Sequence, residues 1–262
     1  MAYRMNAFDN FDSILCVGPH HREETRASEK QYGLQPKTLI DAGYCVVDSI
    51  LASDTLLSVS QPQAGEQGKR VLIAPSWGEN ALIETRGGEL VEVLLEAGHQ
   101  VTVRPHYMTI QNHPGLLREL GKRFGAHSKF LLDTDLQSQG TVHSSDIMIS
   151  DWSGAALEFA FGLERPVLFV DLPKKVNNPD YQKIGLVPVE MWLRSQIGEV
   201  ISPDRLSDIP AAVKRLCENP GKWREAIREV RDCLIYNIGS SAKVSADYIA
   251  QVASGAGPES HH

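Results

Sequence analysis

From residue 70 onward, short apolar runs alternate with segments of helical periodicity. The clearest runs read RVLIA, QVTVR, DIMIS and PVLFV, and they begin at Arg70, Gln100, Asp146 and Pro166. The helical segments between such runs are about 10–12 residues long, which is typical of βαβ units. Units of this kind build a parallel sheet. We therefore expect an α/β domain with a doubly wound, Rossmann-like parallel sheet.

Before residue 58 the sequence shows the same strand-like and helix-like periodicities over a shorter stretch. A buried strand is expected at Ser13–Val17, a charged helix at Arg22–Tyr32, an apolar segment at Thr38–Tyr44 and a connecting helix at Val47–Leu57. Polar residues with Gly, Pro and Gln follow at Ser58–Lys69, which is the composition of a linker.

The linker suggests how the chain divides. We expect residues 1–60 to be the remnant of a first lobe with its connector. Residues 61–255 would form a nucleotide-donor-binding α/β domain, and residues 256–262 a disordered tail. Later helices are expected at Gly88–Ala97, Asp204–Asn219, Pro220–Leu234 and Ser240–Val252.

Composition narrows the function classes. The chain is 42% hydrophobic and 23% charged, with a formal net charge of -7. An acidic balance argues against general nucleic-acid binding, which needs a clustered basic surface. The longest apolar stretch, Ala155–Val170, is interrupted by charges and proline, so we expect no membrane span. We expect a cytoplasmic protein, with peripheral contact at the inner face of a membrane left open.

Four cysteines are scattered through apolar stretches with no CxxC pair. We interpret them as buried free thiols in a reducing compartment. No Cys/His group has the spacing of zinc ligands, so we predict no metal site and no cofactor.

The ends of the predicted strands indicate the candidate site, because open parallel sheets bind ligands beyond the carboxyl ends of their strands. Polar or small residues follow the predicted strands at Pro75–Gly78, Arg104–His106, Ser150–Gly154 and Asp171–Pro173. Their clustering is more informative than any one of them.

The stretch Ser150-Asp151-Trp152-Ser153-Gly154 carries the sharpest signal. Ser153 can cap a helix whose free N–H groups and positive dipole end favour a phosphate; the alternative is a simple N-cap without a ligand. Glu158, one turn further on, can accept hydrogen bonds from ribose or sugar hydroxyls, or serve helix electrostatics.

Two other groups of residues are candidates. His106 can donate to a phosphate oxygen or act as an acid or base, and Arg104 can supply charge beside it or pair with an acid. Ser240 and Ser241 open the last predicted helix after Gly239, as a second phosphate cradle or as a plain cap.

Several common motifs are absent from the sequence. There is no GxxxxGK[ST] loop, no GxGxxG after a strand and no GxSxG elbow. Their absence disfavours an ordinary nucleotide hydrolase, a dinucleotide-dependent dehydrogenase and a serine hydrolase.

These stretches, taken in order, resemble a known family. The matching motifs are VGPHH, DAGY followed by Asp48, LIAPSW with Ser76, RPH at Arg104, ISDWSG followed by Glu158, and the segment from Asn237 to Ala242. They are similar to the CDP-glycerol glycerophosphotransferase family, whose counterparts include "APTW", "R-x-H-P" and "ITDYSS". The family builds teichoic-acid-type surface polymers.

The resemblance implies the donor-binding half of a two-lobed GT-B fold and a CDP-glycerol donor. Its donor pocket would include Ser76, Arg104 and His106 from the first strand ends, and, from the third, Ser150, Asp151, Ser153, Gly154 and Glu158. Ser240 and Ser241 would hold the pyrophosphate. A polymer or a lipid-linked molecule would be the acceptor.

Two departures from the family pattern stand out. Gly154 replaces a second serine, and the family's "HGT" motif with its base histidine is not in this chain. We therefore expect a C-terminal portion or a shortened relative, with His106 as the one catalytic candidate and the base unassigned. The alternatives are a nucleotide-sugar transferase or 2-epimerase of GT-B type, and a non-catalytic nucleotide-binding module.

Overall fold

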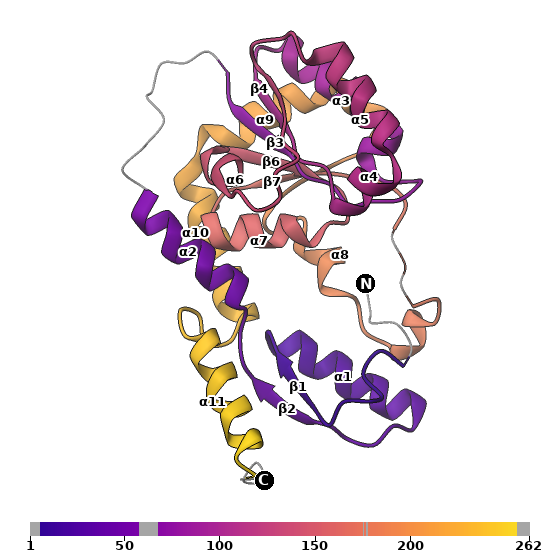
Figure 1. Cartoon of the computed structure of the whole chain (residues 1–262), viewed down its shortest axis with the longest axis vertical. Helices are drawn as coiled ribbons and strands as arrows, with labels where there is room; N and C mark the ends of the chain where they lie inside the picture. Colours follow the sequence, from indigo (N-terminus) through magenta and orange to yellow (C-terminus); the bar gives the residue numbers. More distant parts are fainter. Residues whose placement is uncertain (1–5, 58–67, 175, 177, 256–262) are drawn as a thin grey trace.

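The computed structural model describes residues 6–57, 68–174, 176 and 178–255. They form two parallel sheets, a small one of two strands and a large one of six (Figure 1). The predicted linker, apart from Gly68 and Lys69, and the predicted tail lie outside the described residues.

The large sheet has the strand order β5-β4-β3-β6-β7-β8, and every neighbouring pair is parallel. Counted within this sheet alone, the order is 3-2-1-4-5-6, the Rossmann arrangement. The predicted fold class is confirmed. The strands are β3 (Arg70–Ile73), β4 (Gln100–Val103), β5 (Phe130–Leu132), β6 (Ile147–Ser150), β7 (Val167–Val170) and β8 (Gly198–Ile201).

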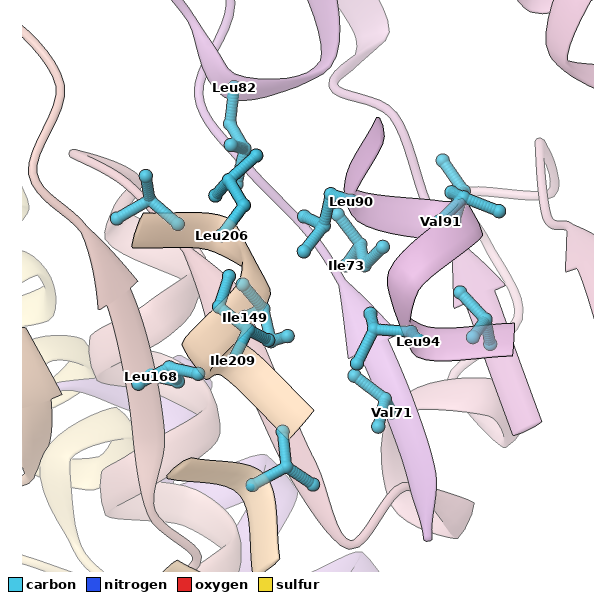
Figure 2. Close-up of a cluster of buried hydrophobic side chains, with 14 of the residues drawn as sticks. Val71, Ile73, Leu82, Leu90, Val91, Leu94, Ile149, Leu168, Leu206 and Ile209 are labelled. Carbon is cyan, nitrogen blue, oxygen red and sulfur yellow. The ribbon is translucent and has the colours of Figure 1, made fainter. Parts of the chain in front are cut away.

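Alternating side chains of the central strands feed two separate cores. In β3, Val71 and Ile73 point into one cluster, while Leu72 points into the other. This is the period of two that a pleated strand imposes, and burial on both faces explains why these runs are continuously apolar. Figure 2 shows the first cluster, where Val71 and Ile73 pack against Leu90 and Leu94.

Three helices cover the face of the sheet that Figure 2 shows. They are α3 (Leu82–Glu96), α5 (Pro114–Phe124) and α9 (Ile209–Glu218). The opposite face is covered by α2 (Cys45–Leu57), α7 (Gly154–Leu163) and α10 (Pro220–Leu234). The result is a three-layer α/β/α domain.

Helix α2 packs on the large domain although it precedes the linker in sequence. Val47 and Ile50 belong to the second core, together with Phe159 of α7. A Cβ atom at Gly162 would lie 2.5 Å from Ile50 Cγ2, so only glycine allows the two helices to approach this closely. The boundary predicted near residue 60 stays a prediction, but α2 shares the core of the larger unit.

The small sheet pairs β1 (Ser13–Cys16) with β2 (Thr38–Asp41). Helix α1 (Pro19–Tyr32) lies beside it, and α11 (Ser241–Ala253) returns to it from the end of the chain (Figure 1). The backbone N–H of Tyr236 donates to the carbonyl of Val17 at 2.9 Å, which ties the start of this return to the small sheet.

The remaining elements are short and lie in the connections. They are α4 (Tyr107–Asn112), α6 (Gly140–Ser144), the 3₁₀ helix η1 (Tyr181–Ile184), α8 (Val189–Leu193) and the 3₁₀ helix η2 (Pro203–Asp208). None of the described helices is both long and apolar enough to cross a membrane.

Several predicted boundaries were wrong. The helix expected from Gly88 begins at Leu82, and the one expected from Asp204 is η2 followed by α9. Strand β8 was not predicted, because its sequence GEVI begins with glycine and carries a charge. Gly198 is required there, since a Cβ would lie 1.7 Å from the carbonyl oxygen of Val167.

The expected free thiols are present, but not all are buried. Cys16 is buried, whereas Cys45 and Cys233 are exposed and Cys217 is intermediate. Burial raises the pKa of Cys217 to about 11, so this thiol stays protonated near neutral pH.

Candidate functional site

The topological switch of the large sheet lies between β3 and β6, which are hydrogen-bonded neighbours. After β3 the chain passes through α3 to β4 on one side of this pair. After β6 it passes through α7 to β7 on the other side. In an open parallel sheet, the crevice at this point is where ligands bind. The strand ends of β3, β4 and β6 therefore form the candidate site.

Asp151 locks the loop after β3 onto the end of β6. Its carboxylate accepts hydrogen bonds from the backbone N–H of Ser76 at 2.7 Å and of Leu82 at 3.0 Å. Asp151 is only 1% exposed and Ser76 is also buried. A buried carboxylate needs such partners, and here they fix the shape of the loop. Direct ligand contacts by Asp151 and Ser76 stay predictions.

Ser150, one residue earlier, also ties the end of β6 to the chain after β3. Its hydroxyl donates to the carbonyl of Ala74 at 2.8 Å, and the residue is fully buried. This bond joins β3 and β6 just beyond the last ladder pair. A direct ligand contact by Ser150 stays a prediction, while its contact with the protein is already made.

The start of α7 is exposed at Gly154. Ser153 caps the helix by accepting a hydrogen bond from the N–H of Ala155 at 3.3 Å, as the sequence predicted. Gly154 is exposed, and a Cβ placed on it would meet nothing within 4 Å. The first turn of this ten-residue helix is therefore unobstructed at Gly154, and the positive end of such a helix favours an anion.

His106 joins the loops that follow β3 and β4. Its Nδ1 accepts a hydrogen bond from the N–H of Met108 at 3.1 Å, so it caps α4. A neutral ring that accepts at Nδ1 carries its proton on Nε2, which makes Nε2 the donating atom. The ring stacks on Trp77 with 6.0 Å between the centroids. A catalytic or donor-binding role for His106 stays a prediction.

Arg104 is held by the protein. Its guanidinium bonds Asp133 at 2.9 Å and the carbonyl of Leu136 at 3.0 Å, and its side chain is 10% exposed. In this structure Arg104 pairs with an acid, which was one of the two alternatives for this residue. A direct contact between Arg104 and a ligand stays a prediction.

Glu158 of α7 is hydrogen-bonded by Tyr44, a residue of the segment that contains the small sheet. The hydroxyl of Tyr44, which follows β2, donates to its Oε1. Burial raises the pKa of Tyr44, and the hydrogen bond to Glu158 raises it further, so the phenol remains a donor. Tyr44 was not predicted as a site residue, because the two partners are 114 residues apart in the sequence. Binding of ribose or sugar hydroxyls by Glu158 stays a prediction.

The second proposed phosphate cradle is filled from within the chain. The carboxylate of Asp48 accepts hydrogen bonds from the N–H of Gly239 at 2.7 Å and of Ser241 at 2.9 Å. Ser241 is fully buried, while Ser240 is exposed and donates to the carbonyl of Asn237. Asp48 is thus the cap of α11, an alternative that the sequence analysis did not consider. Pyrophosphate binding by Ser240 and Ser241 stays a prediction.

A further cluster at the end of β7 was not predicted. Arg194 lies 4.0 Å from the ring centroid of Trp152 and bonds Asp171 at 2.7 Å. Its side chain is 6% exposed, whereas that of Asp171 is 56% exposed. Only the position of Asp171 at a strand end pointed to this cluster. It leaves an oriented carboxylate at the same edge of the sheet as α7.

Among the residues that the structure describes, no group of three or more His, Cys, Asp or Glu side chains is arranged to hold a metal ion.

A sequence model described as CDP-Glycerol:Poly(glycerophosphate) glycerophosphotransferase matches residues 6–175. The chain belongs to this family. The match includes β3, β4 and β6 and the loops that form the candidate site. The predicted family is confirmed. No curated protein matches the chain.

Solved structures of the wall teichoic acid polymerase TagF share the fold. One histidine variant of TagF has a TM-score of 0.60 at 14% identity, covering 97% of this chain and 62% of that one. A second histidine variant has a TM-score of 0.57 at 16% identity, covering 93% and 58%. The second variant soaked with CDPG has a TM-score of 0.53 at 15% identity, covering 93% and 57%. The chain thus spans about three fifths of the TagF structures it matches, and at these identities the likeness establishes the GT-B-like fold.

Proposed function

We propose that the chain binds CDP-glycerol at the carboxyl ends of β3, β4 and β6 and acts as a glycerophosphotransferase. An acceptor hydroxyl would attack the β-phosphorus, the bond from that phosphorus to the oxygen of CMP would break, and CMP would leave. Membership of the family supports this reaction, and a TagF structure was soaked with CDPG. The acceptor in this proposal is a poly(glycerophosphate) chain.

The open start of α7 is the observation that carries the proposal. Gly154 leaves the N-terminal end of the helix unobstructed, while Ser153 caps it and Asp151 fixes the facing loop. A helix end stabilises an anion by about 0.3–1 kcal/mol at an exposed site and by up to about 2 kcal/mol when partly buried. The affinity for the donor must therefore come from several contacts of this size. The Nε2–H of His106 is the second contact in this proposal.

In the transition state, negative charge builds on the oxygen that leaves with CMP. The α7 dipole and the His106 donor are oriented before the reaction by their own hydrogen bonds. Preoriented dipoles lower a barrier because they need no reorganisation when the charge develops. This is the role that we propose for the two groups.

A charge placed at residue 154 tests the proposal. Gly154→Asp puts a carboxylate at the start of α7, where the structure has room for it and where it should favour the helix. The same carboxylate would repel a donor phosphate. By calorimetry, we expect the affinity for CDP-glycerol and CMP to fall at least about tenfold with no loss of thermal stability.

Gly154→Ser is the matched control, because it adds a side chain without charge. It should bind CDP-glycerol at least as well as the wild type. The proposal is wrong if folded wild-type protein binds neither CDP-glycerol nor CMP, or if the Asp and Ser variants bind equally. A parallel panel of UDP-, GDP- and CDP-linked donors tests the identity of the base.

A further inference from the structure

A buried arginine holds an exposed carboxylate at the end of β7. Arg194 follows α8, and its Nη2 donates to Oδ1 of Asp171 at 2.7 Å. The backbone N–H of Asp171 donates to the carbonyl of Ile201 at 2.8 Å, which fixes the main chain at this point. The second carboxylate oxygen, Oδ2, receives no hydrogen bond from the described residues. The side chain is 56% exposed, so a ligand can reach this oxygen.

This carboxylate lies within reach of the start of α7. The ladder between β6 and β7 pairs Ser150 with Phe169, and Trp152 and Asp171 each follow two residues later. The guanidinium carbon of Arg194 lies 4.0 Å from the ring centroid of Trp152 and 5.4 Å from that of Phe169. Trp152 comes directly before the residue that caps α7. One guanidinium thus bridges the carboxylate and the segment that leads into α7.

Stability alone does not explain the buried arginine. Its Nη1 is buried with no hydrogen-bond partner among the described residues, although its side chain is 6% exposed. Burying a cation with an unpaired donor costs free energy, and a buried ion pair repays that cost only when its remaining donors are satisfied. What the pair does provide is a carboxylate of fixed position and balanced charge beside a helix end that attracts anions.

The free oxygen of Asp171 selects the kind of group that it can bind. An ionised carboxylate only accepts hydrogen bonds, so its partner has to be a donor, and a phosphate oxygen is excluded. Hydroxyl and amine groups both donate. Because Arg194 balances the charge of Asp171, the pair offers no excess negative charge to a cationic amine. A neutral hydroxyl is therefore the matching group.

The place of β7 in the sheet indicates which end of the donor meets this carboxylate. Strand β6, which leads into α7, lies between β3 and β7. On the β3 side, the stacked rings of Trp77 and His106 offer a surface on which a nucleotide base can stack. A diphosphate at α7 carries the nucleoside on one phosphorus and the alcohol on the other. The alcohol then extends to the β7 side, where Asp171 lies.

We propose that Asp171 accepts hydrogen bonds from the hydroxyls of the donor's alcohol and thereby selects a neutral polyol as the group to be transferred. Arg194 is a positioning residue, since it orients the carboxylate and balances its charge. The assignment rests on the proposed transfer at α7 and adds the residue that distinguishes one donor alcohol from another.

Three donors that share the CDP group test the selection by calorimetry on the full chain. They carry glycerol, propanol without a free hydroxyl, and ethanolamine with a cationic amine. A hydrogen bond to a charged group is strong enough for a tenfold difference, so we expect the wild type to bind CDP-glycerol at least about tenfold more tightly than CDP-propanol. Equal affinity for these two, or tighter binding of CDP-ethanolamine than of CDP-glycerol, would overturn the proposal.

Asp171→Ala should remove the preference. We expect this variant to bind CDP-glycerol and CDP-propanol equally, while its affinity for CMP does not fall. Asp232→Ala is the matched control, because Asp232 is 53% exposed and bonds Arg231, whose side chain is 7% exposed. That pair lies at the other end of α7, where Arg231 also bonds Glu164. The control should keep the wild-type preference, and a preference kept by Asp171→Ala would show that Asp171 does not contact the alcohol.

Arg194→Met separates positioning from packing. Methionine packs well on aromatic rings, so it keeps contact with Trp152 and removes the charge. The unbalanced carboxylate of Asp171 would then repel the donor phosphates, and we expect the affinity for CMP to fall at least about threefold. Adding Asp171→Ala to this variant should restore CMP binding. A loss that the second substitution does not restore would contradict the positioning role.

CMP binding also separates this proposal from the proposed function. Folded wild-type protein that binds neither CMP nor CDP-glycerol counts against transfer at α7. If the wild type binds both and Asp171→Ala keeps the preference for glycerol, only the assignment of Asp171 is wrong.

Discussion

At the scale of single residues, Asp151 shows how a polar strand end can serve the protein before it serves a ligand. Both of its carboxylate oxygens accept backbone N–H groups from the loop after β3. Ser150 and Arg104 are committed in the same way, to Ala74 and to Asp133. These residues give the site its shape, and the exposed backbone at Gly154 gives it its charge preference.

His21 should make the fold sensitive to acid. Its Nδ1 accepts a hydrogen bond from the N–H of Val17 at 3.3 Å, near the start of α1. Burial lowers the pKa of His21 to about 4, and repulsion from His20 adds to the effect, against a smaller opposing effect of Glu190. The unfolded chain therefore binds the proton more readily than the folded one between pH 6.5 and pH 4.

The sign of the effect follows from this difference. Stability is complete above about pH 6.5 and falls as the pH drops toward 4, by about 1–3 kcal/mol for this group after allowance for partial solvent exposure. The side-chain oxygen of glutamine can accept a hydrogen bond from the same backbone N–H, and glutamine does not titrate. Urea unfolding of His21→Gln at pH 7.5 and pH 4.5 should show a smaller loss than the wild type. An equal loss in both proteins would exclude His21 as a cause.

At the scale of elements, helix ends decide how the chain is tied together. The α7 end is left open, whereas the α11 end is closed by Asp48 from α2. Gly43 allows this approach, because a Cβ there would lie 2.2 Å from the carbonyl oxygen of Tyr236 and 2.4 Å from Ser241 Oγ. Two helices that begin nearly 200 residues apart are therefore joined through one carboxylate.

Removing that carboxylate should loosen α11. Asp48→Ala leaves the N–H groups of Gly239 and Ser241 without their acceptor, and we expect a loss of about 1–3 kcal/mol. Hydrogen exchange at the start of α11 should become faster. Asp247→Ala is the control, because Asp247 lies on the same helix and bonds Lys243 on the surface. Equal protection of α11 in both variants would contradict the role assigned to Asp48.

At the scale of the whole molecule, the chain crosses between its two sheets more than once. Helix α2 leaves the small sheet and packs on α7, and the end of α10 leads back to the small sheet through Tyr236. The hydroxyl of Tyr44 donates to Glu158 across this junction, one turn from the open end of α7. The candidate donor site is thus mechanically connected to the smaller part of the chain.

Tyr44→Phe tests this connection by removing one oxygen atom. The hydrogen bond runs to a carboxylate, so we expect a loss of about 1.5–3 kcal/mol in unfolding free energy. The variant should also weaken CDP-glycerol binding, since Glu158 would lose the partner that orients it. Tyr107→Phe, at an exposed tyrosine of α4, is the control for stability. Unchanged stability of Tyr44→Phe would show that the two parts are held by other contacts.

Much of the large domain follows from local pattern. Continuous apolar runs such as VLI at β3 are required by a sheet that is covered on both faces, and the 3.6-residue period marks the helices between them. The N-cap at Ser153 was predictable, because the residues that indicate it lie within three positions of one another in the sequence. Strand β8 escaped prediction, since Gly198 is chosen by contact with Val167 and not by strand propensity.

The sequence by itself determined the α/β class, the family and the strand ends where chemistry gathers, because each of these depends on neighbours within a few positions. Tertiary structure alone decided which polar groups are already paired. Asp48 fills the α11 end, Tyr44 reaches Glu158 and Asp151 holds the loop at Ser76, all across long separations in the chain. Hydrogen bonds of this kind depend on distances in space, and only the folded chain brings their partners within reach.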